Sequence, residues 1–195
     1  MKKLVTLLVV ALMALTASAQ VTWNVKGGVG VASCIMEGED EENEKFVGKI
    51  GFGIEVPFAS DWSLMPSLEM AWKGAVWETP DFDYKETLNE SYLQIPVLVA
   101  YRLNLNPRWN MTIKAGPYVA LLLSAKDKIE FMGEEQEVDL SDLDANKIDV
   151  GIDIGVDFEY HRFVFGLEYE LGFVSMLPDV DIKNSAVYFT AGYKF

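Results

Sequence analysis

The sequence is poor in cysteine, histidine and basic residues. Its 195 residues include one cysteine, Cys34, and one histidine, His161. A lone cysteine excludes an internal disulfide. The 16 basic residues are outnumbered by 30 acidic residues, and the net charge is -14. Nucleic-acid binding needs clustered Lys and Arg, so this acidity excludes that class of partner.

Long hydrophobic runs are also lacking, apart from one at the start. Lys2 and Lys3 precede the run LVTLLVVALMAL, which is followed by Ala17-Ser18-Ala19. This order is typical of a secretory signal with an A-x-A cleavage site. The run is shorter than the roughly 20 apolar residues of a spanning helix. We therefore expect a signal peptide over residues 1–19 and one domain over residues 20–195.

In place of long runs, the chain has apolar and polar residues in alternation. The stretch KIDVGIDIGVDFEY, from Lys147 to Tyr160, alternates without a fault from Ile148 onward. A period of two is typical of a strand with two unlike faces. Similar runs occupy residues 21–32, 50–58, 62–73, 91–102, 109–123, 163–173 and 185–195. Most have the roughly 9 to 11 residues that a tilted strand needs to cross a bilayer.

The connections between these runs alternate in length. Those at residues 59–61, 103–108 and 161–162 are short, and those at 33–49, 74–90, 124–146 and 174–184 are long and hold most of the acidic residues. Short periplasmic turns and long external loops are typical of outer-membrane barrels. The sequence therefore predicts an all-β fold, an eight-stranded antiparallel up-and-down transmembrane β-barrel.

Alternation alone does not say which face of the barrel meets water. In a soluble periplasmic barrel that binds an apolar ligand the apolar face would look inward, whereas in a membrane barrel it faces lipid. In each run the apolar residue nearest a short turn or a terminus is aromatic, as expected of an interfacial girdle. The predicted girdle comprises Trp23, Phe58, Trp62, Tyr101, Trp109, Tyr160, Phe163 and Phe195. So many rings would not fit inside a narrow barrel, which favours the membrane interpretation.

Two segments carry a family resemblance. The run ESYLQIPVLVAYRL, followed by IKAGPYVALLLSAK and a last strand ending in AGYKF, resembles the PorT-like outer-membrane β-barrel family of Bacteroidota. The resemblance implies an integral outer-membrane barrel, and an accessory role in secretion is an alternative that it raises. Nothing in these motifs ties the chain to secretion in particular.

The polar phase of the runs predicts a charged interior. It contains Lys26, Glu55, Glu69, Lys73, Gln94, Arg102, Lys114, Asp149, Asp153, Asp157, Glu159, Glu168, Glu170 and Lys194. We expect these side chains to face the interior, and we expect a polar network among Lys26, Glu55, Glu69, Arg102, Lys114, Asp153, Asp157, Glu159, Glu168, Glu170 and Lys194. Such carboxylates suit a glycosidase pair or a metal site, but pairing with Lys26, Arg102, Lys114 and Lys194 is favoured because unmatched buried charges are costly. Eight strands leave no aqueous channel, so we expect a closed lumen without porin activity.

No catalytic, cofactor-binding or metal-binding residue is predicted. His161 lies in a predicted periplasmic turn, away from the external side where a lipid-modifying or proteolytic site would lie, and Cys34 lacks a base. The run DLSDLDAN from Asp139 lacks the Gly and closing Glu of a calcium loop. The acidic run EGEDEENE from Glu37 is interpreted as a solvated loop, with weak divalent-cation binding as an alternative.

Prolines interrupt three of the runs, at Pro66, Pro96 and Pro117. Because proline cannot donate to a ladder, we expect a bulge or a locally open ladder around Ile95-Pro96 and Gly116-Pro117.

The predicted function is that of a structural or interaction protein of the outer membrane without catalysis. Expected partners are outer-membrane lipid and lipopolysaccharide, a protein at the external loops, and the barrel assembly machinery. The assembly machinery would recognise the C-terminal strand, in which Tyr193 and Phe195 are aromatic. That strand is expected to close the sheet against residues 21–32, because an open edge would leave unpaired backbone groups in hydrocarbon.

Overall fold

The structure, a computed structural model, describes residues 21–36, 44–79, 84–131, 134–139, 146–175 and 182–195. The predicted signal peptide and most of the runs EGEDEENE and DLSDLDAN lie outside these residues. Within the described ranges, no helix is long and apolar enough to cross a membrane.

The described residues form ten antiparallel strands. Their bounds are β1 Thr22–Met36, β2 Lys45–Pro57, β3 Trp62–Lys73, β4 Val76–Thr79, β5 Tyr84–Asn106, β6 Trp109–Phe131, β7 Glu134–Asp139, β8 Ile148–Tyr160, β9 Phe163–Gly172 and β10 Ile182–Lys194.

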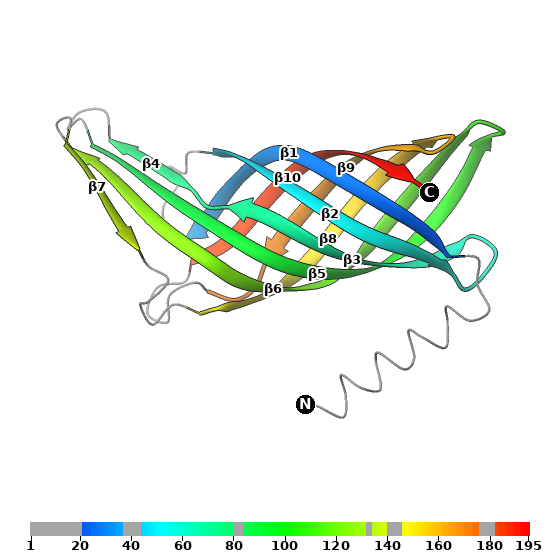
Figure 1. Cartoon of the computed structure of the whole chain (residues 1–195), viewed down its shortest axis with the longest axis horizontal. Helices are drawn as coiled ribbons and strands as arrows, with labels where there is room; N and C mark the ends of the chain where they lie inside the picture. Colours follow the sequence, from blue (N-terminus) through cyan, green and yellow to red (C-terminus); the bar gives the residue numbers. More distant parts are fainter. Residues whose placement is uncertain (1–20, 37–43, 80–83, 132–133, 140–145, 176–181) are drawn as a thin grey trace, which may run out of the picture.

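Eight of these strands close into a ring. The order β5-β3-β2-β1-β10-β9-β8-β6 is closed by pairing between β5 and β6. The last strand meets the first in a long register that includes Val25 opposite Tyr193 and Val31 opposite Val187. The predicted eight-stranded antiparallel barrel is therefore confirmed, and Figure 1 shows its tilted strands with the short turns and the C-terminus at one end.

At the other end the structure differs from the sequence interpretation. Residues 74–90 and 124–146 were expected to be loops, yet β5 and β6 continue through 84–90 and 124–131, and β4 and β7 pair with these extensions. Similarly, β1 runs on to Met36 and β2 begins at Lys45 rather than Ile50. These extensions lack strict alternation because neither of their faces is held to an apolar phase.

The prolines interrupt the ladders as predicted. Between the pairs Pro96–Tyr118 and Val99–Ala115 the β5–β6 ladder has a gap. A second gap separates the pair Pro66–Val97 from Glu69–Gln94 in the β3–β5 ladder. The locally open ladder around Pro96 and Pro117 is thus confirmed, and it extends to the neighbouring strand.

The burial pattern is that of an inside-out protein. On β9, Leu167 is 58% exposed while its neighbour Glu168 is 1% exposed. The same alternation runs along β8 and β10, with apolar residues outside and charged or small residues inside, together with Tyr188 on β10. An apolar belt of this kind is costly in water and is stable against hydrocarbon, so the outer wall is suited to a bilayer.

Candidate functional site

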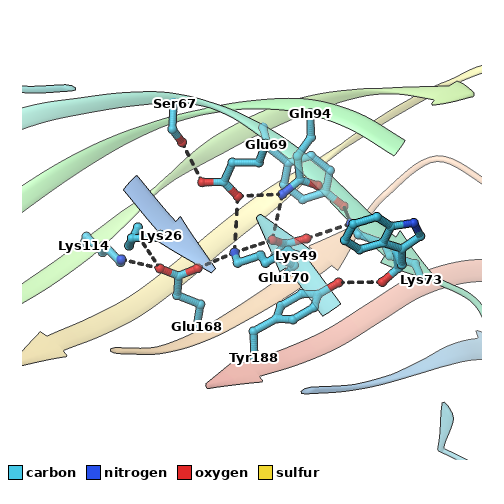
Figure 2. Close-up of polar contacts among 12 residues, drawn as sticks. Lys26, Lys49, Ser67, Glu69, Lys73, Gln94, Lys114, Glu168, Glu170 and Tyr188 are labelled. Carbon is cyan, nitrogen blue, oxygen red and sulfur yellow. Dashed lines mark hydrogen bonds and ion pairs between the residues drawn. The ribbon is translucent and has the colours of Figure 1, made fainter. Parts of the chain in front are cut away.

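The barrel interior holds a network of buried charges, and Glu168 is at its centre. One oxygen of Glu168 contacts the ammonium groups of Lys26 at 2.6 Å and Lys114 at 2.5 Å, and the other contacts Lys49. Lys114 also holds Asp157 at 2.7 Å. Figure 2 shows Lys26, Lys49 and Lys114 around the Glu168 carboxylate. Each charge is therefore met by an opposite charge, as burial requires.

Glu170 continues the network toward the end where β4 and β7 lie. Its carboxylate pairs with Lys49 at 2.9 Å and Lys73 at 2.8 Å, and it accepts a hydrogen bond from Gln94 Nε2 at 2.8 Å. The Gln94 amide also donates to Glu69 at 3.2 Å. Gln94 thereby joins carboxylates of β3 and β9 across the lumen (Figure 2).

A second group of charges lies at the end with the short turns. Glu55 accepts from Arg102 at 2.6 Å, from Lys194 at 2.8 Å and from the Ser63 hydroxyl at 3.1 Å. Lys194 also contacts Glu159, which lies 3.6 Å from Arg102. This group ties the C-terminal strand to β2, β5 and β8.

At the opposite end the interior becomes aromatic and apolar. Tyr118 donates to Asp149 at 2.8 Å, and the Lys73 ammonium lies 4.5 Å from the Tyr118 ring centre. Asn184 donates to Tyr92 at 3.1 Å. Beyond them lies a buried cluster with Trp77 packed against it: Cys34, Ala75, Leu88, Tyr92, Tyr118, Ala120, Leu122 and Ala125.

The structure places each residue of the predicted interior network inside the barrel. Lys26 and Arg102 are half-buried, and the others are buried. All but Asp153 take part in the ion pairs above or in the Gln94 contact; Asp153 is buried with its Oδ1 lacking a hydrogen-bond partner.

Sequence reasoning missed several members of the network. Lys73, Gln94 and Asp149 were predicted to face the interior but were not named in the network; Lys73 pairs with Glu170, and Gln94 donates a hydrogen bond to it. Lys49 was assigned to a loop. The signal that would have found Lys49 is its position two residues before Gly51, in the inward phase of β2.

The predicted girdle residues gather at the end with the short turns. Trp62 packs at a tilt against Tyr101 with ring centres 4.9 Å apart, and Trp109 packs at a tilt against Tyr160 with ring centres 4.7 Å apart. Trp23, Phe58, Phe163 and Phe195 are exposed on the same outer wall. Tyr193 joins the group by packing edge-on against Phe163 and Phe195. These rings lie where an interfacial belt would lie.

The extensions of β5 and β6 stand beyond the lipid-facing residues Leu93 and Leu123. With β4 and β7 they form a sheet in the order β4-β5-β6-β7. We call these residues, 76–79, 84–90, 124–131 and 134–139, the external sheet. Within it, partial burial and the nearby Glu86 carboxylate raise the pKa of Asp127 to about 6. A hydrogen bond of 2.6 Å to Glu86 raises the pKa of Tyr84 to about 12.

No group of three or more His, Cys, Asp or Glu side chains in the described part of the chain is arranged to hold a metal ion. His161 lies in the β8–β9 turn, where its φ is 57° and its ring packs edge-on against Tyr160. This turn is at the end opposite the external sheet, as Figure 1 shows.

The sequence of this barrel also matches a model of a known protein family. The model of the outer membrane protein beta-barrel domain matches residues 16–177. The chain belongs to this family. Its members are outer-membrane proteins, so this β-barrel domain is a transmembrane barrel of that membrane. No curated protein of similar sequence was found.

Several solved structures of other proteins are similar to this chain at low sequence identity. The outer membrane enzyme PagL is 12% identical over 87% of this chain and 98% of its own, with a TM-score of 0.54. Ail, the attachment invasion locus protein of Yersinia pestis, is 16% identical over 89% of this chain and 98% of its own, with a TM-score of 0.47. Neisserial surface protein A is 8% identical over 89% and 97%, with a TM-score of 0.48. At this identity the likeness to PagL shows the fold alone.

Proposed function

We propose that this β-barrel domain is a closed outer-membrane barrel that works as an interaction protein through its external sheet and performs no catalysis. The observation that carries the proposal is the filled interior. Matched ion pairs occupy its middle, and Tyr92, Tyr118 and Tyr188 are buried beside them. An eight-stranded barrel has room for such side chains and not for a water column as well.

The finer parts of the proposal rest on the sequence. A signal peptide at residues 1–19 would deliver the chain to the periplasm, and the C-terminal strand would present it to the barrel assembly machinery. The PorT-like motifs on β5 and β6 make an accessory role in secretion the alternative. The proposed absence of catalysis is supported by the position of His161 in the β8–β9 turn, at the end opposite the external sheet.

Solute flux tests whether the lumen is closed. Liposomes containing the purified barrel should swell in a small sugar no faster than protein-free liposomes. A porin of about 16 strands at the same protein-to-lipid ratio provides the open-channel control. Swelling at the rate of that porin would overturn the proposal. Release of the native protein from membranes by carbonate without detergent would instead favour the soluble periplasmic barrel.

The external sheet is the surface proposed for a protein partner. Its strand β7, EEQEVD, pairs with β6 on one side, and within the described residues it is the last strand of the sheet order. An open strand edge can accept an extended segment by strand addition, and this acidic edge selects a basic one.

A peptide pair tests this surface. A fluorescent peptide of alternating Lys and Val should bind the reconstituted protein, and a Glu-for-Lys peptide of equal length should not, as measured by anisotropy. Deleting residues 134–139 should abolish binding while the barrel keeps its heat-modifiable gel mobility. Equal binding of both peptides would refute the proposed edge.

A further inference from the structure

A groove opens in the membrane-facing wall where β2 and β3 part. The β2–β3 ladder ends at the pair Lys49–Ala71, so residues 45–48 of β2 pair only with β1. Gly74, with a φ of +121°, turns the chain from β3 toward β4, and Ala75 then accepts a hydrogen bond from Leu88 of β5 at 2.9 Å. Strands β2 and β3 are therefore unpaired at the external end of the wall.

Apolar side chains line the open side of this groove, which has a volume of about 340 Å³. Phe46 is 74% exposed and Trp72 43% exposed, and Val29 of β1 lies beside them. Gly48 leaves space between them: a Cβ there would lie 3.2 Å from the Gly28 carbonyl oxygen and 3.8 Å from the Trp72 ring. The volume is at the lower end of the range of roughly 300–1,000 Å³ for ligand sites.

Lys45 supplies a cation to the same groove. Its ammonium group donates to the carbonyl oxygens of Lys73 at 3.2 Å and Leu88 at 2.7 Å, and to Asn89 Oδ1 at 2.8 Å. These three acceptors are neutral, and the carboxylate that acts on Lys45, that of Glu90, is buried behind the groove. The lysines inside the barrel differ, because Lys26, Lys49, Lys73 and Lys114 each contact a carboxylate.

We propose that this groove binds the lipid A part of lipopolysaccharide, with an acyl chain against Phe46, Trp72 and Val29 and a phosphate beside Lys45. The inference rests on the proposed orientation, in which the external sheet stands outside the cell. In that orientation the groove faces the outer leaflet, where a water-soluble partner does not reach.

Two physical needs favour such an occupant. The free edge of β2 at residues 45–48 carries backbone donors and acceptors that hydrocarbon does not satisfy, whereas a polar headgroup does. The ammonium group of Lys45 donates only to neutral oxygens and attracts an anion on the open side of the groove, where low-dielectric surroundings strengthen its interaction with a phosphate. A phosphorylated acylated lipid meets both needs in one molecule, with an apolar part for the aromatic wall.

Native mass spectrometry of the folded barrel tests the proposal. The protein is reconstituted in nanodiscs that contain lipopolysaccharide, phosphatidylglycerol or phosphatidylcholine, and is then released in mild detergent. The expected result is one retained lipopolysaccharide molecule per barrel and at least tenfold lower retention of either phospholipid. Equal retention of phosphatidylglycerol would assign the groove to phospholipid and overturn the proposal.

Variants locate the site. Gly48→Leu fills the groove, and Phe46→Ala removes an exposed aromatic side chain from its wall without changing the barrel interior. Each substitution should lower lipopolysaccharide retention at least tenfold. Lys45→Gln should lower it severalfold. The matched controls Ala115→Leu, on the lipid-facing side of β6, and Lys147→Gln, beside β8, should leave it unchanged.

If Gly48→Leu fails to give a heat-modifiable barrel, lipopolysaccharide retention by Phe46→Ala and Lys45→Gln tests the proposed site. Unchanged retention in both would overturn the proposal. Liposome swelling is measured on the same preparations, so a leaky barrel that still retains lipopolysaccharide would refute the closed lumen and leave the groove in place.

Discussion

Replacing Glu168 with Gln tests whether matched charges hold the barrel together. Glu168 is 1% exposed and pairs with three lysines from β1, β2 and β6. The substitution keeps the size of the side chain and removes its charge. Two of the three lysines retain another carboxylate, because Lys114 keeps Asp157 and Lys49 keeps Glu170.

The expected cost follows from the third lysine. Lys26 pairs with Glu168 at 2.6 Å, and its side chain is 13% exposed. Breaking a buried ion pair by removing one partner costs about 3–5 kcal/mol. Because the Lys26 side chain retains some exposure, we expect a loss near the lower end, about 3 kcal/mol in the free energy of unfolding.

Reversible urea unfolding in lipid vesicles, followed by tryptophan fluorescence, measures this loss. The control is Glu130→Gln, which breaks the exposed Lys128–Glu130 pair of the external sheet, with side chains 35% and 39% exposed. Such exposed pairs contribute about 0–1 kcal/mol. Adding Lys26→Met to Glu168→Gln should recover part of the loss. A Glu168→Gln barrel within about 1 kcal/mol of the wild type would refute the reasoning.

Three further predictions concern other parts of the molecule. Gly116→Ala should destabilise the barrel by about 1–3 kcal/mol in the same urea assay, because its Cβ would lie 2.2 Å from the Val97 carbonyl oxygen. Gly27→Ala, whose Cβ meets only the Lys49 carbonyl oxygen at 3.8 Å, should be neutral. Asp127 has a raised pKa of about 6 when folded, so its contribution to stability is present below about pH 4 and is lost as pH rises through 6. Hydrogen exchange of the external sheet should accordingly be faster relative to Asp127→Asn at pH 7.5 than at pH 5, and an equal ratio at both would contradict this. Deleting residues 193–195 should abolish heat-modifiable gel mobility, since it removes the Lys194 ion pairs and the Phe195–Trp23 backbone hydrogen bond. Deleting residues 39–42 should not, and normal mobility after the first deletion would count against closure by β10.

The strands within the apolar wall could be predicted because lipid constrains every second residue. β3 has the predicted bounds, and β8 lacks only Lys147 from the quoted run. Beyond Leu93 on β5 and Leu123 on β6 this constraint ends, and the chain reads YKETLNE and SAKDKIEF, without a strict apolar phase. Their strand structure comes from cross-strand pairing alone, which a single sequence does not reveal.

The position of the interior tyrosines was harder to predict than that of the girdle. A narrow barrel was expected to exclude many rings from its interior, but glycines on the facing strands make room for some of them. Tyr188 is paired with Gly30, and Tyr118 with Gly151. A Cβ at Gly151 would lie 2.5 Å from the Tyr118 ring, so the glycine makes room for it. Such a pair is visible only once the register between strands is known.

The charged network supplies a kind of information that the apolar wall lacks. A one-residue slip of a strand turns its apolar side inward and is costly, but a two-residue slip keeps the faces and costs the wall little. The ion pairs distinguish these registers. A two-residue slip of β9 would put either Glu170 or Gly166 at the level of Glu168, so Lys26 and Lys114 would meet a different carboxylate or none. We infer that the lipid-facing phase selects the barrel and that the buried charges select its register.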